Sequence, residues 1–284
     1  MQKLDLIVAL TASATESKQS SIRPDTWYSR KADLQMQIFT FPRKTYWLIR
    51  FLGIWRGLLA IVVKPAAIIS KLFSKNDWYW QFVESQFDKA HNVDTVEKIP
   101  VEQLQMSESQ KEQAVFYEPS QMMEFGFVFS KLDVDFGDYT FVDIGSGKGK
   151  TLMLASWFGF KTIVGIEISQ PLVEIANQNV NAFAKSRNLS RDLISTVCSD
   201  AVSAPIPDGP IVIFLFNPFH ESAIDSFLTN LRRTLQSDFR KALVVYANPV
   251  CGDMFDSKSW LKKIRSEFRG FYSVYEAMNN FEKN

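Results

Sequence analysis

The second half of the chain alternates short apolar runs with amphipathic helical patterns, and this alternation limits the possible folds more than any other feature. The runs are apolar at successive positions, which is typical of strands buried on both faces of a sheet. Such strands, separated by helices, form a mainly parallel sheet covered on both sides. The sequence therefore predicts an α/β protein of the Rossmann-like, doubly wound class with a helical N-terminal extension. The expected strands are residues 141–144, 162–168, 194–198, 211–216 and 242–247, and the expected helices are residues 148–158, 171–187, 221–235 and 253–268.

Composition excludes several classes of protein. The 284 residues are 46% hydrophobic, which is enough for a sizeable core and too apolar for a disordered chain. The net charge of +1 excludes a uniformly basic nucleic-acid binder. Two cysteines and two histidines can form neither a disulfide scaffold nor a zinc cluster of the usual spacing, so we expect no metal.

The small net charge hides an asymmetry along the chain. Residues 1–75 carry 12 Lys or Arg against 4 Asp or Glu, a net charge of +8, so residues 76–284 carry −7. We expect a loosely ordered segment over 1–40, a basic and aromatic helical extension over 41–110, and the α/β domain over 111–284. The start of the chain resembles a signal peptide only faintly, because its apolar run is short, so the expected location is the cytoplasm.

An apolar and aromatic segment, Tyr46–Phe73, has three possible interpretations. It could pack as a helical cap on the α/β domain, lie as an amphipathic helix pair on an anionic membrane surface, or cross a membrane. Its longest run without a charged residue, 57–63, is far too short for a spanning helix. Pro65 is expected to interrupt the helix near its middle. Contact of residues 41–75 with the inner membrane face therefore stays open.

A glycine-rich loop with the sequence DIGSGKG follows the first expected strand, at residues 143–149, where ligands bind in such sheets. The loop comes close to two nucleotide-binding motifs without matching either. A P-loop would need glycine in place of Ile144, and a dinucleotide-binding loop would need glycine in place of Lys150. Neither a nucleoside triphosphate nor a dinucleotide is therefore the expected ligand.

The residue types in and after the loop favour a smaller, positively charged ligand. Gly145 permits the sharp turn, and Gly147 and Gly149 let backbone N–H groups approach a ligand with no Cβ in the way. The helix N-terminus favours a carboxylate, and Glu167, at the end of the next strand, is placed to accept hydrogen bonds from a ribose. Asp143 would repel a pyrophosphate and attract a cation. A ligand with an amino group, a carboxylate and a ribose fits this pattern better than a dinucleotide.

These residues resemble the class I S-adenosylmethionine-dependent methyltransferases over roughly residues 110–270. The likeness rests on four motifs in order: the glycine-rich loop, Gly165-Ile166-Glu167, Cys198-Ser199-Asp200-Ala201 and Asn217-Pro218-Phe219. It implies S-adenosyl-L-methionine as cofactor, with the loop on its methionine part, the acidic residue on its ribose and the Asp-Ala pair on its adenine. The implied cofactor-binding residues are Tyr117, Asp143, Gly145, Ser146, Gly147, Gly149, Glu167, Ile168, Asp200, Ala201 and Asn217.

The segment Phe116–Ser120 resembles the one that closes over the cofactor in a bacterial branch of this family. Tyr117 is therefore either part of a lid over the cofactor or a packing residue. The same branch is similar to lysine methyltransferases that lack a SET domain. That similarity covers the cofactor half of the domain and implies a protein acceptor.

Asn217 and Phe219 are the predicted catalytic residues. In families with a fuller version of this motif, the Asn accepts a hydrogen bond from a substrate nitrogen and the aromatic ring packs on it, and the resemblance carries these roles to the two positions. The alternative is that Asn-Pro only ends a strand, which the second copy at Asn248 supports. Lys148 and Lys150 are expected to be solvated.

The resemblance implies a methyltransferase that modifies nitrogen in a protein lysine or another large acceptor. Two alternatives stay open: a small-molecule or lipid-linked acceptor at the membrane surface, and a module that binds S-adenosylmethionine without turnover. The expected partners are this cofactor and an unidentified methyl acceptor. Only residues 271–284 remain for the antiparallel hairpin that usually ends the sheet in this family, so that hairpin is expected to be incomplete or to leave a surface open to a partner.

Overall fold

The computed structural model describes residues 44–73, 78–97, 99, 120–202, 204–217 and 220–281, all within one compact unit, Pro42–Asn284. Three sequence predictions fall outside the described residues: the loosely ordered segment 1–40, the lid residue Tyr117 and the catalytic residue Phe219. The domain boundaries expected at residues 40 and 110 stay predictions.

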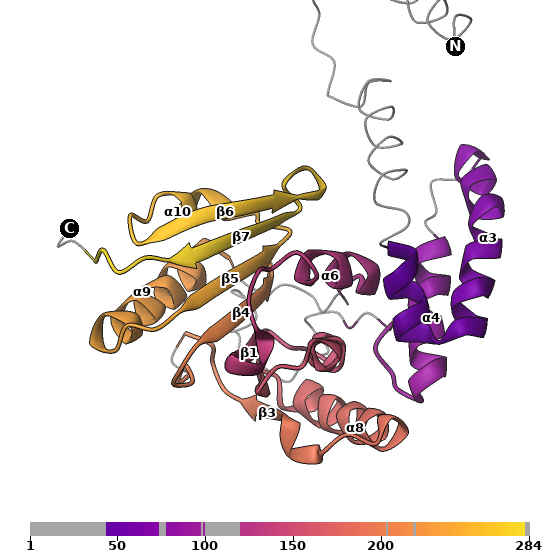
Figure 1. Cartoon of the computed structure of the whole chain (residues 1–284), viewed down its shortest axis with the longest axis horizontal. Coiled ribbons are helices and arrows are strands. Elements are labelled where there is room, and N and C mark those ends of the chain that lie inside the picture. The colour runs from indigo at the N-terminus through magenta and orange to yellow at the C-terminus, as the bar shows by residue number, and fades with distance from the viewer. Residues whose placement is uncertain are drawn as a thin grey trace, which may run out of the picture. The chain divides into compact units, whose positions relative to one another are not determined.

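One sheet runs through the described part of the chain (Figure 1). Its seven strands are β1 Thr140–Ile144, β2 Thr162–Glu167, β3 Ile194–Cys198, β4 Ile211–Phe216, β5 Ala242–Ala247, β6 Leu261–Glu267 and β7 Tyr272–Ala277. They lie in the order β3-β2-β1-β4-β5-β7-β6, with the first five parallel and β7 antiparallel to both of its neighbours. The chain order reverses between β1 and β4, which is where ligands bind in doubly wound sheets. The predicted fold class is confirmed.

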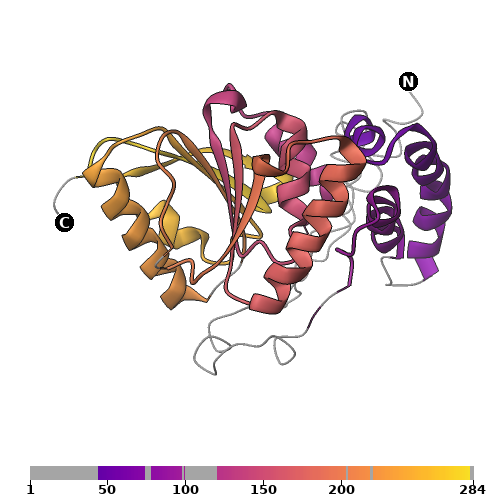
Figure 2. The same cartoon turned by 90° about the horizontal axis from the view of Figure 1, so that it is seen from below.

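Helices cover both faces of the sheet. They are α6 Met122–Phe129, α7 Lys150–Ala155, α8 Gln170–Arg187, α9 Glu221–Ser237 and α10 Gly252–Asp256, with 3₁₀ turns η2 Phe136–Asp138, η3 Ser156–Phe158, η4 Arg191–Leu193 and η5 Phe268–Gly270. Successive strand residues alternate between two cores: Phe141 and Phe214 pack with α6, α7 and α8, whereas Val142 and Ile213 pack with α9. Figure 2 shows the orange α9 and the salmon α8 on opposite sides of the sheet.

The N-terminal extension packs on the α/β domain through aromatic side chains. It consists of a helix over residues 44–52, then α3 Ile54–Phe73 and α4 Trp78–His91. The ring of Trp47 stacks on Phe158 with centroids 4.6 Å apart, and Phe51 meets Trp157 edge-on at 4.9 Å. All four side chains belong to, or pack against, the core that α6, α7 and α8 share. The interpretation as a packed helical cap is therefore confirmed for residues 44–52.

Two further contacts join the extension to α6. The indole of Trp47 lies directly on Gly126, where an added Cβ would be 2.5 Å from the indole Cγ. Lys44 Nζ pairs with Glu124 Oε1 at 2.6 Å, and both side chains are largely buried. The extension is therefore built into the core of the domain.

The helix-breaking role expected for Pro65 is wrong. α3 continues through Pro65, and the chain turns instead at Gly53, whose φ of +78° lies in the left-handed region. Packing of α3 along α4 outweighs the local preference of one proline. Among the helices that the structure describes, none is both long enough and apolar enough to cross a membrane.

The helix expected over residues 253–268 is also wrong. The helix ends at Asp256, and Leu261–Glu267 forms β6, which completes an antiparallel hairpin with β7. Lys262 and Lys263 are exposed on this edge strand, where charged side chains are common. In the sequence, the same charged residues look like the polar face of an amphipathic helix, which led to the wrong prediction. The hairpin expected to be incomplete is thus present.

Substitution Gly126→Ala should destabilise the protein by about 1–3 kcal/mol, because the new methyl group must displace the Trp47 indole from a filled core. Thermal or denaturant unfolding measures this change. Gly252→Ala is the matched control, since the nearest atom to its added Cβ would be at 3.6 Å, an ordinary contact. Equal stability of the two variants would contradict the packing of Trp47 on α6.

Candidate functional site

The glycine-rich loop joins β1 to α7 where the strand order reverses. Gly145, Gly147 and Gly149 have φ values of 77°, 51° and 80°, a left-handed conformation that other residues rarely adopt. The N–H groups of Gly145 and Ser146 both donate to the carbonyl oxygen of Ile166 in β2, at 2.9 and 3.1 Å. The loop is therefore anchored to the neighbouring strand.

Glu167, the last residue of β2, also supports the loop. Its buried carboxylate accepts hydrogen bonds from the N–H groups of Gly147 and Ser169, both at 2.9 Å. Burial raises the pKa of Glu167, and these backbone hydrogen bonds offset part of the rise. A carboxylate can accept further hydrogen bonds, so Glu167 can hold the loop and bind ligand hydroxyl groups together.

Asp143 lies near the end of β1, where it is buried and accepts a hydrogen bond from the hydroxyl group of Thr151 in α7. Burial raises the pKa of Asp143 to about 7; the hydrogen bond from Thr151 opposes this rise, and the charge of Glu167 adds to it. Ionising both carboxyl groups together is costly because their negative charges repel each other. A positively charged ligand would remove this cost.

Two buried hydroxyl groups near these carboxylates have no hydrogen-bond partner: Ser146 Oγ and Ser169 Oγ. Buried polar atoms are nearly always paired, so an unpaired one indicates a place for a ligand atom or an ordered water. Ser146 belongs to the predicted cofactor-binding set, whereas Ser169 is new. The sequence contains one signal for Ser169: it lies directly before a helix, where serine usually caps the helix N-terminus. In the structure its hydroxyl group makes no capping hydrogen bond.

The solvated state expected for Lys148 and Lys150 is wrong, since both side chains are almost fully buried, at 1% and 2% exposure. Lys150 forms an ion pair with Glu84 of α4. Lys148 Nζ lies 3.2 and 3.1 Å from the two carboxylate oxygens of Asp94, just after α4. The partners come from the extension, so nothing in the local sequence of the loop reveals them.

Asn179 of α8 completes this connection between the loop and the extension. Its side-chain amide donates to the backbone carbonyl oxygens of Asp94 and Lys148, at 2.8 and 3.0 Å, and accepts from the N–H of Asp94 at 2.9 Å. Asp88 of α4 holds the next residues by accepting from the N–H and hydroxyl groups of Thr95, at 2.7 and 2.6 Å. The chain after α4 is therefore fixed against the glycine-rich loop.

The other residues predicted to bind the cofactor, Ile168 and the Asp200-Ala201 pair expected at the adenine, lie at the next strand ends along the same edge of the sheet. Ile168 follows β2 and is half-buried, and Ser199 after β3 donates its N–H to the Glu167 carbonyl oxygen at 3.0 Å. Asp200 is exposed and accepts from the N–H of Val202 at 2.9 Å, while Ala201 is buried. The structure thus brings the three cofactor motifs together at one edge.

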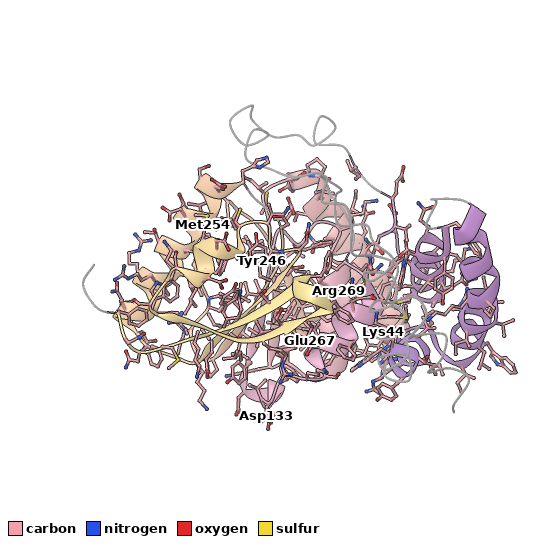
Figure 3. The ribbon with its side chains drawn as sticks, turned by 90° about the horizontal axis from the view of Figure 1, so that it is seen from above. Lys44, Asp133, Tyr246, Met254, Glu267 and Arg269 are labelled. Carbon is pink, nitrogen blue, oxygen red and sulfur yellow. The ribbon has the colours of Figure 1, made fainter. Side chains whose placement is uncertain are left out.

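Asn217 lies directly after β4, with a left-handed φ of 40°. Its Oδ1 accepts a long hydrogen bond, 3.4 Å, from the hydroxyl group of Tyr246 in β5. Burial raises the pKa of Tyr246 to about 12, so this hydroxyl stays protonated. Figure 3 shows Tyr246 on the same side of the sheet as Met254 of α10. Tyr246 is a buried strand residue, and its sequence context does not distinguish it from a core tyrosine.

Asn248 repeats this arrangement one strand further along. It follows β5 with a φ of 48°, and the register pairs Phe216 with Ala247, so Asn217 and Asn248 leave adjacent strand ends. The backbone N–H of Asn248 donates to the Phe271 carbonyl oxygen at 2.7 Å. Both asparagines therefore turn the chain at the edge that carries the glycine-rich loop.

Comparison with known families finds a match to the central part of the chain. Residues 142–238 match the model of a family described as a methyltransferase domain. The match covers about a third of the chain and supports a methyltransferase. Its cofactor is S-adenosylmethionine, the ligand implied by the resemblance of the loop and the strand-end motifs. Among the described residues, no group of three or more His, Cys, Asp or Glu side chains could hold a metal ion.

Three of the solved structures that are similar to this chain come from named bacteria. An RNA methyltransferase from Salinibacter ruber, in complex with S-adenosyl-L-homocysteine, is 22% identical over 58% of this chain and 97% of its own, with a TM-score of 0.41. A predicted N6-adenine-specific DNA methylase from Listeria monocytogenes is 17% identical over 56% and 51%, with a TM-score of 0.43. A ribosomal protein L11 methylase from Lactobacillus delbrueckii subsp. bulgaricus is 14% identical over 56% and 79%, with a TM-score of 0.40. No curated protein matches the chain.

Substitution Glu84→Gln should cost about 3–5 kcal/mol of stability, because it leaves the Lys150 ammonium group buried without a counter-charge. Adding Lys150→Met to this variant should restore most of the loss, since it removes the uncompensated charge. Denaturant unfolding of the single and double variants measures both effects.

Asp225→Asn is the control for that experiment. It breaks an exposed ion pair with Lys258, 3.3 Å long, which should cost under about 1 kcal/mol. A Glu84→Gln variant as stable as this control would contradict the buried pair.

Proposed function

We propose that the protein transfers a methyl group from S-adenosylmethionine to nitrogen in a large acceptor, and that this acceptor is a protein lysine. The observation that supports this most is the group at the carboxyl ends of β1 and β2: two buried carboxyl groups, Asp143 and Glu167, beside a backbone cradle and two unpaired hydroxyl groups. This arrangement suits a ligand with positive charge and several hydrogen-bonding groups. The likeness to lysine methyltransferases without a SET domain supports the choice of acceptor.

In this proposal, each part of the cofactor meets a different strand end. The N–H groups of the glycine-rich loop and the hydroxyl of Ser146 bind the methionine part. Glu167 and Ser169 bind the ribose hydroxyl groups, which gives Ser169 Oγ the partner that it lacks. Ile168, Asp200 and Ala201 surround the adenine. Gly145, Gly147 and Gly149 keep the cradle free of Cβ atoms.

Asp143 contributes electrostatic attraction at close range. Its carboxyl group is half-ionised near neutral pH because its pKa is raised to about 7. Bound S-adenosylmethionine supplies a methyl group on a positively charged sulfur, together with an ammonium group. Either positive charge favours the ionised form of Asp143, so binding should release a proton from this carboxyl group.

Asn217 positions the acceptor nitrogen in this proposal. Methyl transfer is an in-line displacement, so catalysis depends largely on alignment of the nitrogen with the methyl carbon. The side-chain oxygen of Asn217 accepts a hydrogen bond from that nitrogen, and the hydroxyl of Tyr246 fixes the orientation of the amide. Phe219, two residues after Asn217 in sequence, keeps its predicted role as an apolar wall in this proposal.

A second candidate function has one specific observation in its favour. The outer face of α3 exposes large apolar side chains, such as Trp55 and Val62, to solvent. A lipid-linked or other membrane-bound acceptor would account for such a surface beside a methyltransferase. This second candidate function would place the protein at the inner membrane face. A protein acceptor would be compatible with the cytoplasm as well.

Titration calorimetry with S-adenosylmethionine tests the cofactor site. The affinity should rise about tenfold between pH 6 and pH 8, since the ionised fraction of Asp143 rises from about one tenth to about nine tenths over that range. In the Asp143→Asn variant this rise in affinity should disappear, so that only the pH dependence caused by ionisation of the ligand itself remains. Absence of binding in the natural protein would overturn the proposed function.

Transfer of labelled methyl groups tests the role of Asn217 and separates an enzyme from a module that only binds. The natural protein should label an acceptor in a lysate of cells that lack it. Asn217→Ala should lower the rate about 100-fold with little change in cofactor affinity, because it removes positioning of the acceptor and leaves the loop intact. Equal rates in the two proteins would remove Asn217 from the chemistry, and binding without any transfer would indicate a module without turnover.

A further inference from the structure

One face of α3 is apolar and exposed, and the methyltransferase site does not use it. With 3.6 residues per turn, the exposed residues of this face fall within an arc of about 140°. Exposed fractions reach 84% at Trp55 and 74% at Val62. Soluble proteins rarely keep a continuous apolar patch without a partner for it. We call this patch the α3 stripe; it consists of Ile54, Trp55, Leu58, Leu59 and Val62.

The opposite face of α3 is fixed to the rest of the extension, so the helix cannot roll over to bury the stripe. Ala60 is fully buried, and its carbonyl oxygen accepts a hydrogen bond from the Tyr79 hydroxyl of α4 at 3.1 Å. Arg56 donates to Gln86 of α4 at 3.0 Å. Gly57 lies against the preceding helix, where an added Cβ would be 2.9 Å from the Ile49 side chain. Figure 1 shows α3 and α4 side by side.

The sequence around the stripe carries charge of one sign, although Lys44 pairs with Glu124 and Arg56 is turned to Gln86 of α4. Residues 44–76 contain six Lys or Arg and no Asp or Glu. Arg50, in the helix just before α3, is exposed. Basic residues next to exposed Trp and Leu side chains are the composition of helices that lie in the interface of anionic membranes. An uncharged partner surface would not require this excess of positive charge.

We propose that α3 docks on an anionic lipid surface, with the α3 stripe in the interfacial region and the exposed Arg50 near the headgroups. The helix lies on the membrane, in keeping with its inability to cross one. Each Lys or Arg near such a surface contributes an attraction that salt weakens, and the stripe adds apolar burial. The proposal deepens the second candidate function, because it brings the methyltransferase to acceptors at a membrane.

Flotation of the full chain with lipid vesicles tests this docking. The natural protein should bind vesicles that contain phosphatidylglycerol and should not bind vesicles of phosphatidylcholine. Added salt should weaken the binding. The double variant Trp55→Ser with Val62→Ser should bind at least tenfold less. Ile264→Ser, which changes an exposed apolar residue on β6, is the matched control and should bind like the natural protein.

Three results would overturn the proposal. The first is that the natural protein does not bind anionic vesicles, and the second is that the double variant binds them equally well. The third is that the natural protein self-associates in solution and the double variant does not, which would show that a second copy covers the stripe. The changed residues are exposed, so thermal unfolding should show the variants folded. Titration with S-adenosylmethionine on the same samples separates the two proposals: retained cofactor binding without membrane binding would sink the docking surface alone.

Discussion

Pairing of two buried lysines with carboxylates of the extension is the interaction on which the rest of the site depends. A buried ammonium group without a counter-charge costs several kcal/mol. The burial of Lys150 therefore depends on Glu84, and Asp94 also pairs with the buried Lys148. These lysines belong to the loop that carries the left-handed glycines, so the geometry of the cradle is set partly by residues more than 50 positions earlier in the chain. The support of the glycine-rich loop extends beyond the residues that the family match covers, because Glu84 and Asp94 precede residue 142.

The same pairing determines the charge that a ligand meets. The positive charges of the loop are directed to the extension, which leaves Asp143 and Glu167 to set the field at the ends of β1 and β2. Pyrophosphate groups would be repelled there, in agreement with the absence of a complete P-loop or dinucleotide motif. S-adenosylmethionine carries its positive charges on sulfur and nitrogen and would be attracted.

The sequence was sufficient where neighbours along the chain decide the conformation. Strand β4 and strand β5 were predicted with the bounds observed, because runs apolar on both faces have few other uses. Prediction failed where distant contacts decide. The burial of Lys150 depends on α4, and β6 depends on pairing with β7, which no local pattern shows. Ser169 was not predicted as a ligand-binding residue for a related reason. A serine before a helix points to a ligand only when the structure shows that its buried hydroxyl group has no hydrogen-bond partner.

The packing of Trp47 on Gly126 of α6 has a consequence for how the protein unfolds. The helix over residues 44–52 and the sheet residues Phe141 and Phe214 share one hydrophobic core, so removing the first exposes the second. Elements that share a core usually melt in a single cooperative transition. Proteolysis after α4 would then yield an unstable remnant instead of an active fragment, and the cell could not release a free methyltransferase by trimming this chain.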